Sequence, residues 1–310
     1  MANRTPRILY HYCSLETFQN IIENKSIWLS DVQKSNDSKE LDWIKGQCRY
    51  YILKTWVDYI KSMDDEQRLN QVTVENYNEI EKLEKLIQDY NYTKTWAFCL
   101  SEKRDDLSQW RGYADDGFGI SIGFKSDFFM NLQLVSHYID EDSNFYFKKV
   151  NYSKSQVEDF FCNYLDLKNI DASDTAENVI YKLNKCVYLS ILNAPFFKNE
   201  SFKVEKEWRL AYSMSYLELL RGNIPIVLPQ KDDFEHNIES NYGYVVKNNE
   251  LVSHIEIKFP SIKDFISSIT LGPKSKINVL DMKEYLIYQG VLKDAFDKSI
   301  KIHISSSTYR

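Results

Sequence analysis

The chain has 310 residues, of which 43% are hydrophobic and 27% charged, and its formal net charge is −6. This composition is typical of a globular protein; it excludes a disordered chain, and the acidic balance argues against a broad nucleic-acid-binding face. The sequence has no apolar run near the roughly 20 residues that span a bilayer, and its N-terminus lacks the apolar core of a signal peptide, so we expect a cytoplasmic protein without a membrane partner.

The first third of the chain combines short strands with helices. Residues 7–12 and 26–30 are predicted strands, and Ser14 is placed to cap the helix between them. Helical spacing follows over about 41–63 and 74–90, and the alternating residues 93–100 predict a further strand.

Residues 117–124 predict a strand with one face almost free of side chains. Phe118, Ile120, Ile122 and Phe124 share one face, while the other face carries three glycines and a serine. Such a face invites the close approach of another backbone or of a ligand.

The remaining chain again mixes both element types. Predicted strands cover 145–152, 202–212, 250–259, 266–272 and 300–306, and predicted helices cover about 155–165, 176–192 and 279–289. Because strands and helices do not alternate regularly, we expect a single α+β domain over 1–310 with a mixed or antiparallel central sheet. The segments at about 41–90 and 155–192 are then helical insertions between core strands.

The cysteines give little sign of a special role. The five cysteines are widely spaced, and none forms a C-x-x-C pair, so we expect no metal site from them. Cys13 and Cys99 lie in apolar strand patterns, where thiols are usually buried and inert.

The segment FKVEKEWRLAY, residues 202–212, carries the strongest candidate for chemistry. In a continuous strand, Glu205, Glu207 and Arg209 project from one face, and Trp208 from the other. Two neighbouring carboxylates tend to raise the pKa of one of them, and a carboxylate stabilises the oxocarbenium-like state of glycosidic cleavage. The alternative is an exposed strand end whose acids pair with Lys203, Lys206 and Arg209.

Three other groups are candidates, each with a structural alternative. His11, between two tyrosines, could orient a ribose hydroxyl or be a hydrogen-bonded core residue. Trp110 and Tyr113 share a helix side and could stack on a leaving base or belong to the core. Asp37 lies in a turn at Asn36-Asp37 and Glu40 at the helix start that follows, and both could be solvated or join a metal site.

The sequence resembles a bacterial family catalogued as domain of unknown function 2971. The resemblance rests on four stretches in the family's order: LYHYCSLETFQNII, SIWLS…SNDSKE, CLSEKRDDLSQWRGYADDGFGISIGF and FKVEKEWRLAY. They extend from residue 9 to about 212, and a further echo, ITLGPKS, lies at 269–275.

A looser resemblance connects the chain with ADP-ribosyltransferases, through a first strand carrying Tyr-His and a late strand carrying Glu-x-Glu. It implies that His11 holds the ribose of NAD, that Ser101 takes the middle position and that Glu207 stabilises the oxocarbenium ion, while Glu205 orients the acceptor. Tyr113 and Trp110 are then stacking residues. Arg209 either keeps a glutamate ionised or binds a phosphate. The middle strand departs from the family pattern because it lacks the Ser-Thr-Ser triplet of one class and the correctly spaced Tyr of the other.

These resemblances imply an enzyme that consumes NAD as its substrate without a metal. It would transfer ADP-ribose to a protein or nucleic acid, or hydrolyse NAD, in the manner of toxin or anti-phage defence proteins. Two alternatives stay open from the residues alone. One is a metal-dependent nuclease or phosphodiesterase that uses His11, Asp37, Glu40, Glu205 and Glu207, and the other is a non-catalytic ligand-sensing or interaction module.

Overall fold

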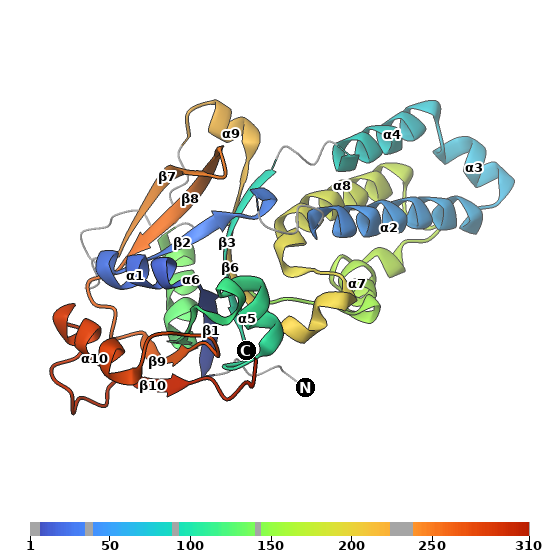
Figure 1. Cartoon of the computed structure of the whole chain (residues 1–310). Coiled ribbons are helices and arrows are strands. Elements are labelled where there is room, and N and C mark those ends of the chain that lie inside the picture. Colours follow the sequence, from blue (N-terminus) through green and yellow to red (C-terminus); the bar gives the residue numbers. More distant parts are fainter. Residues whose placement is uncertain (1–6, 35–39, 89–92, 140–143, 224–237, 310) are drawn as a thin grey trace.

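The computed structural model describes residues 7–34, 40–88, 93–139, 144–223 and 238–309 (Figure 1). Its strands are β1 (Ile8–Cys13), β2 (Ser26–Asp31), β3 (Thr93–Ser101), β4 (Ile120–Lys125), β5 (Phe145–Lys149), β6 (Glu207–Ser215), β7 (Glu239–Lys247), β8 (Glu250–Lys258), β9 (Ile266–Leu271) and β10 (Lys301–Ile304). Its α-helices are α1 (Leu15–Asn24), α2 (Glu40–Ser62), α3 (Asp65–Gln71), α4 (Val74–Gln88), α5 (Leu107–Tyr113), α6 (Ser126–Ile139), α7 (Lys154–Asp159), α8 (Ala176–Asn193), α9 (Tyr216–Leu220) and α10 (Val279–Tyr288). The predicted α+β class, with a mostly antiparallel sheet, is confirmed.

The strands of the described residues form one ten-stranded sheet that forks at β3. The main order is β10-β9-β4-β1-β3-β2-β8-β7, and β6 pairs with both β3 and β5. One edge of β3 pairs with β6 along its whole length, whereas β1 meets β3 only where Tyr10 lies opposite Ser101. The sheet is therefore joined across β1 and β3 at a single residue pair, and the next residue of β1 is His11.

Two main hydrophobic cores lie on opposite faces of this sheet. The larger core packs α1, α6 and α10 against the strands, through residues such as Phe18, Phe129 and Leu286. The second core is formed by the helices of 40–88 and 154–193, which lie together beside the sheet in Figure 1. Ala97 and Ala211 are neighbours across β3 and β6, and both belong to this second core. Their small side chains leave room for the helices to pack close to the strands.

Helix capping explains several helix starts. Ser14 accepts a hydrogen bond from the Thr17 amide at the start of α1, as the sequence predicts. Asp106 accepts amide hydrogen bonds from Ser108 and Gln109 at the start of α5, and this cap fixes the short helix that carries Tyr113.

The glycine-rich face of β4 is filled by the protein itself, which corrects the idea of an open ligand face. The strand begins at Ile120, after a turn in which Gly117 has a φ of 93°. A Cβ atom on Gly119 would collide with the carbonyl oxygen of Cys13, and one on Gly123 would collide with Ser268 Oγ. The glycines therefore permit close approach of neighbouring strands rather than of a ligand.

Candidate functional site

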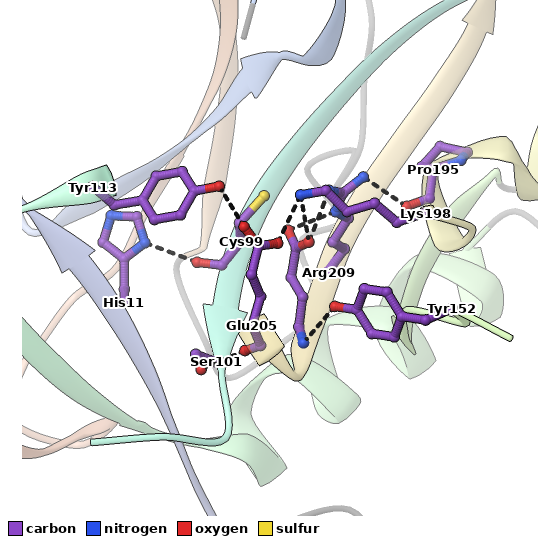
Figure 2. Close-up of polar contacts among 10 residues, drawn as sticks. His11, Cys99, Ser101, Tyr113, Tyr152, Pro195, Lys198, Glu205 and Arg209 are labelled. Carbon is purple, nitrogen blue, oxygen red and sulfur yellow. Dashed lines mark hydrogen bonds and ion pairs between the residues drawn. The ribbon is translucent and has the colours of Figure 1, made fainter. Parts of the chain in front are cut away.

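The two glutamates converge through a turn, not through strand alternation as predicted. Residues 200–205 form a 3₁₀ helix, and β6 begins only at Glu207. Between them Lys206 adopts the left-handed region with a φ of 46°, which turns the chain from the helix into the strand. The prediction of a strand over 202–206 is wrong, yet both carboxylates still lie in one buried cluster around Lys198. Figure 2 shows Glu205, Lys198 and Arg209 of this cluster.

Arg209 binds Glu207 with two parallel hydrogen bonds. Its Nε lies 2.7 Å from Oε1 and its Nη2 lies 2.9 Å from Oε2 of Glu207, while Nη1 donates to the carbonyl oxygen of Pro195 at 2.8 Å. Both side chains are buried. Of the two roles left open for Arg209, this geometry supports holding a glutamate ionised, since the fork of the guanidinium is directed at the carboxylate.

Lys198 is a central residue of the cluster that the sequence reasoning missed. Its Nζ lies 2.7 Å from Oε2 of Glu205 and 3.4 Å from Oε2 of Glu207, and its side chain is only 4% exposed. The signal that could have revealed it is charge: two carboxylates on one buried face need more than the single cation of Arg209.

The cluster keeps Glu207 ionised. Burial raises the pKa of its carboxyl group, but the charges of Arg209 and Lys198 outweigh this effect and lower that pKa to about 2, with help from a hydrogen bond to the Cys99 thiol. The expectation that repulsion raises the pKa of one carboxylate is therefore wrong for Glu207, because cations separate it from the neighbouring acid.

Three hydroxyl groups fix the backbone and side chains of the two glutamates. The Tyr113 hydroxyl donates to Oε1 of Glu205 at 2.8 Å, and the Ser101 hydroxyl donates to the carbonyl oxygen of Glu205 at 2.6 Å. The Tyr152 hydroxyl accepts from the amide of Glu207 at 2.9 Å. Ser101 is buried and thus supports the 3₁₀ turn, whereas Tyr113 is 44% exposed and connects Glu205 with the surface.

His11 lies beside the cluster at the fork of the sheet and contacts Cys99 and Phe98. Its Nδ1 lies 2.9 Å from the carbonyl oxygen of Cys99, and its ring stacks on Phe98 at a centroid distance of 4.3 Å. Burial lowers the pKa of His11 to about 4 despite this hydrogen bond, so the imidazole is neutral at pH 7. A carbonyl can only accept, so Nδ1 carries the proton and Nε2 is left as an acceptor.

Two sequence interpretations fail at this site. Cys99 is exposed rather than buried, because it lies where β1 and β3 separate. Trp110 is completely buried, donates from Nε1 to Asp105 at 2.7 Å and packs edge-on against Tyr12, so it belongs to the core and does not form a stacking surface. Trp208 is buried on the opposite face of β6, as predicted.

The structure thus brings Tyr113, Glu205, Glu207 and Arg209 into one cluster with Lys198. His11 lies beside this cluster and is joined to it through the carbonyl group of Cys99. Figure 2 shows His11 and Tyr113 on one side of Glu205, with Lys198 and Arg209 on the other.

The residues proposed as metal ligands are only partly described. Asp37 lies outside the described residues, and so does the side chain of Glu40, whose backbone begins α2. Among the residues that the structure describes, no group of three or more His, Cys, Asp or Glu side chains is arranged to hold a metal ion. Within the same residues, none of the helices is both long enough and apolar enough to cross a bilayer.

The fold and the site define an α+β protein with a forked, mostly antiparallel sheet and a buried carboxylate–cation cluster at the fork. Residues 109–210 match the model of a family described as "Protein of unknown function (DUF2971)", which confirms the predicted family resemblance over this part of the chain. The match begins in α5 and ends in β6, so it includes Tyr113, Glu205, Glu207 and Arg209. No curated protein and no solved structure matches the chain.

Proposed function

We propose that the protein cleaves the bond between nicotinamide and ribose in NAD and passes the ADP-ribose to a macromolecular acceptor or to water. The observation that carries this proposal is the buried pair of glutamates bridged by Lys198 and contacted by Tyr113, with His11 beside them at the fork of the sheet. These residues come from three separate parts of the chain, and the resemblance to ADP-ribosyltransferases gives His11, Tyr113 and the two glutamates a role each.

Paired carboxylates suit this bond cleavage because positive charge develops on the ribose. The electrons of the C1′–N bond leave with nicotinamide, which departs as a neutral molecule, and the ribose becomes oxocarbenium-like. A carboxylate that stays ionised in a buried setting stabilises such a cation without reorganising. The lowered pKa of Glu207 meets this requirement.

The geometry supports a division of work between the two acids. Glu207 has both oxygens bound by Arg209, so it contributes a fixed charge and holds Lys198 in place. Glu205 shares its oxygens between Lys198 and the exposed Tyr113, so we assign to Glu205 the closer approach to the ribose and the acceptor.

The remaining residues fit the other parts of NAD. The neutral His11 offers Nε2 as an acceptor for a ribose hydroxyl. The ring of Tyr113 is exposed enough to stack on the nicotinamide, and its hydroxyl bond to Glu205 fixes the ring orientation.

The test is to incubate the purified protein with NAD and to measure nicotinamide release, with and without protein and nucleic-acid acceptors. We expect release by the wild type and a loss of at least a hundredfold in Glu207→Gln. Absence of release under all acceptor conditions, or full release by Glu207→Gln, would contradict the proposal. Tight NAD binding without release would instead favour a sensing module.

A further inference from the structure

The C-terminal segment Ser305–Tyr309 runs from β10 back to the helix α5 (Figure 1). Its first anchor is the carboxylate of Asp105. Oδ1 of Asp105 accepts from the Ser305 hydroxyl at 2.6 Å, and Oδ2 accepts from the amide and the hydroxyl of Ser306 at 2.7 and 2.9 Å. Because the same carboxylate accepts from Nε1 of Trp110, it connects the C-terminal segment directly with α5.

The second anchor lies at the other end of α5. The Tyr309 hydroxyl donates to Oδ1 of Asp116 at 2.8 Å, and Lys274 donates to Oδ2 of the same carboxylate at 2.8 Å. The Nζ of Lys274 also lies 3.9 Å from the centre of the Tyr309 ring. Tyr309 is thus held by a hydrogen bond and by a cation–π contact.

The segment between the two anchors needs this support. Asp115 and Asp116 have φ values of 52° and 51°, which residues with a Cβ rarely adopt, and surrounding contacts must hold them there. The helix α5 has only seven residues, which is too short to be stable alone. Tyr113 lies in the last position of this helix, and only Ala114 separates it from Asp115.

We propose that Ser305–Tyr309 is a positioning strap that fixes α5 and the following turn, and so places the Tyr113 hydroxyl against Glu205. Asp105, Asp116 and Tyr309 act through Tyr113 and are positioning residues. The catalytic consequence of the strap rests on the proposed function, but its effect on the helix does not.

The test measures hydrogen–deuterium exchange of the amides of 107–117 in full-length variants. One variant combines Ser305→Ala with Ser306→Ala, a second is Tyr309→Phe, and the matched control is Thr308→Ala, whose side chain is exposed. Losing the hydrogen bonds to the half-buried carboxylate of Asp105, or the one to the exposed carboxylate of Asp116, is expected to speed exchange in 107–117 by about tenfold in the first two variants. The control is expected to exchange like the wild type, and Ser305→Thr combined with Ser306→Thr, which retains both hydroxyls, is expected to restore slow exchange.

Unchanged exchange of 107–117 in both strap variants, or equally faster exchange throughout the chain, would overturn the proposal. Where the wild type releases nicotinamide, the strap variants should also release it more slowly at an unchanged urea midpoint. If the wild type releases none while the exchange result holds, the proposed function fails and the strap stands.

Discussion

Glu207 has a role in the fold as well as in the proposed chemistry. Its carboxylate neutralises Arg209 and part of Lys198 in a region with almost no solvent contact. Removing one partner of a buried ion pair leaves the other charge buried without compensation, which costs more than the pair itself contributes.

We therefore expect Glu207→Gln to lower the free energy of unfolding by about 3 to 5 kcal/mol, because Arg209 and Lys198 keep their charges. Urea unfolding at pH 7.5, followed by tryptophan fluorescence, measures this change. The matched control is Glu200→Gln, which removes an exposed pair with Lys203 and should cost less than about 1 kcal/mol. Equal unfolding midpoints for the two variants would contradict the buried ion-pair network.

His11 makes a separate prediction about pH. Burial lowers its pKa in the folded state to about 4, so the unfolded chain takes up the proton first as pH falls. The free energy of unfolding is therefore unaffected by His11 at pH values above its ordinary pKa of 6.5. It decreases as the pH falls from 6.5 toward 4, because the unfolded chain binds a proton that the folded chain does not. By pH 5 the loss should reach no more than about 2 kcal/mol.

The comparison for this pH effect is His11→Asn, whose side-chain N–H can donate to the Cys99 carbonyl as Nδ1 does but which does not titrate. Urea unfolding at pH 7.5 and pH 5 should show a larger loss of stability in the wild type than in His11→Asn. An equal loss in both proteins would show that His11 is not held neutral in the folded state.

At the scale of elements, the strand β4 and the residue that precedes it depend on glycines for contact with their neighbours. A Cβ on Gly119 would meet two backbone carbonyl groups, those of Cys13 and Ala114, and backbone cannot move aside as a flexible side chain can. Gly112, by contrast, is exposed in α5 and has nothing within 4 Å of an added Cβ.

We expect Gly119→Ala to lower the free energy of unfolding by roughly 1 to 3 kcal/mol, through overpacking at the junction of β4 with β1. Gly112→Ala should leave it unchanged or raise it by up to about 1 kcal/mol, since alanine favours a helix more than glycine. Thermal unfolding of both variants checks this, and a harmless Gly119→Ala would mean that β4 does not approach β1 as closely as described.

Most elements could be predicted from periodicity, and the failures have physical causes. Alternation identifies β3, and the apolar face of Phe18, Ile21 and Ile22 identifies α1. The helix α6 was missed because its apolar residues keep no clean helical spacing: Phe128 to Met130 are consecutive, and Leu132 and Leu134 then alternate with polar residues. The strand β7 was missed because its side chains are largely polar and exposed.

The turn at Lys206 escaped prediction for a different reason. Nothing local marks a lysine as left-handed, and the conformation is held by tertiary contacts, among them the bond from Ser101 to the Glu205 carbonyl. The sequence could therefore select the two glutamates as a pair but could not predict the turn that brings them together.

At the scale of the whole molecule, the site lies where strand β1, strand β6 and the segment after helix α8 meet. His11 comes from β1, Glu207 and Arg209 come from β6, and Lys198 follows the helix α8 of the second core. Contacts between elements so far apart in the chain cannot be inferred from local patterns, which explains why Lys198 was missed while residues within family motifs were found.

Ser101 and Trp110 have structural roles instead of the binding roles predicted for them. Both side chains are buried, and both already form hydrogen bonds within the protein.

The most direct measurement of the central claim is the rate of nicotinamide release by Glu205→Gln relative to Glu200→Gln. Glu205 is the better probe because its change leaves the paired bonds between Arg209 and Glu207 in place. With both variants shown to be folded, we predict that Glu205→Gln releases nicotinamide at least a hundredfold more slowly than the wild type, while Glu200→Gln matches it. Equal release by the wild type and Glu205→Gln, or no release by the wild type, would contradict the account.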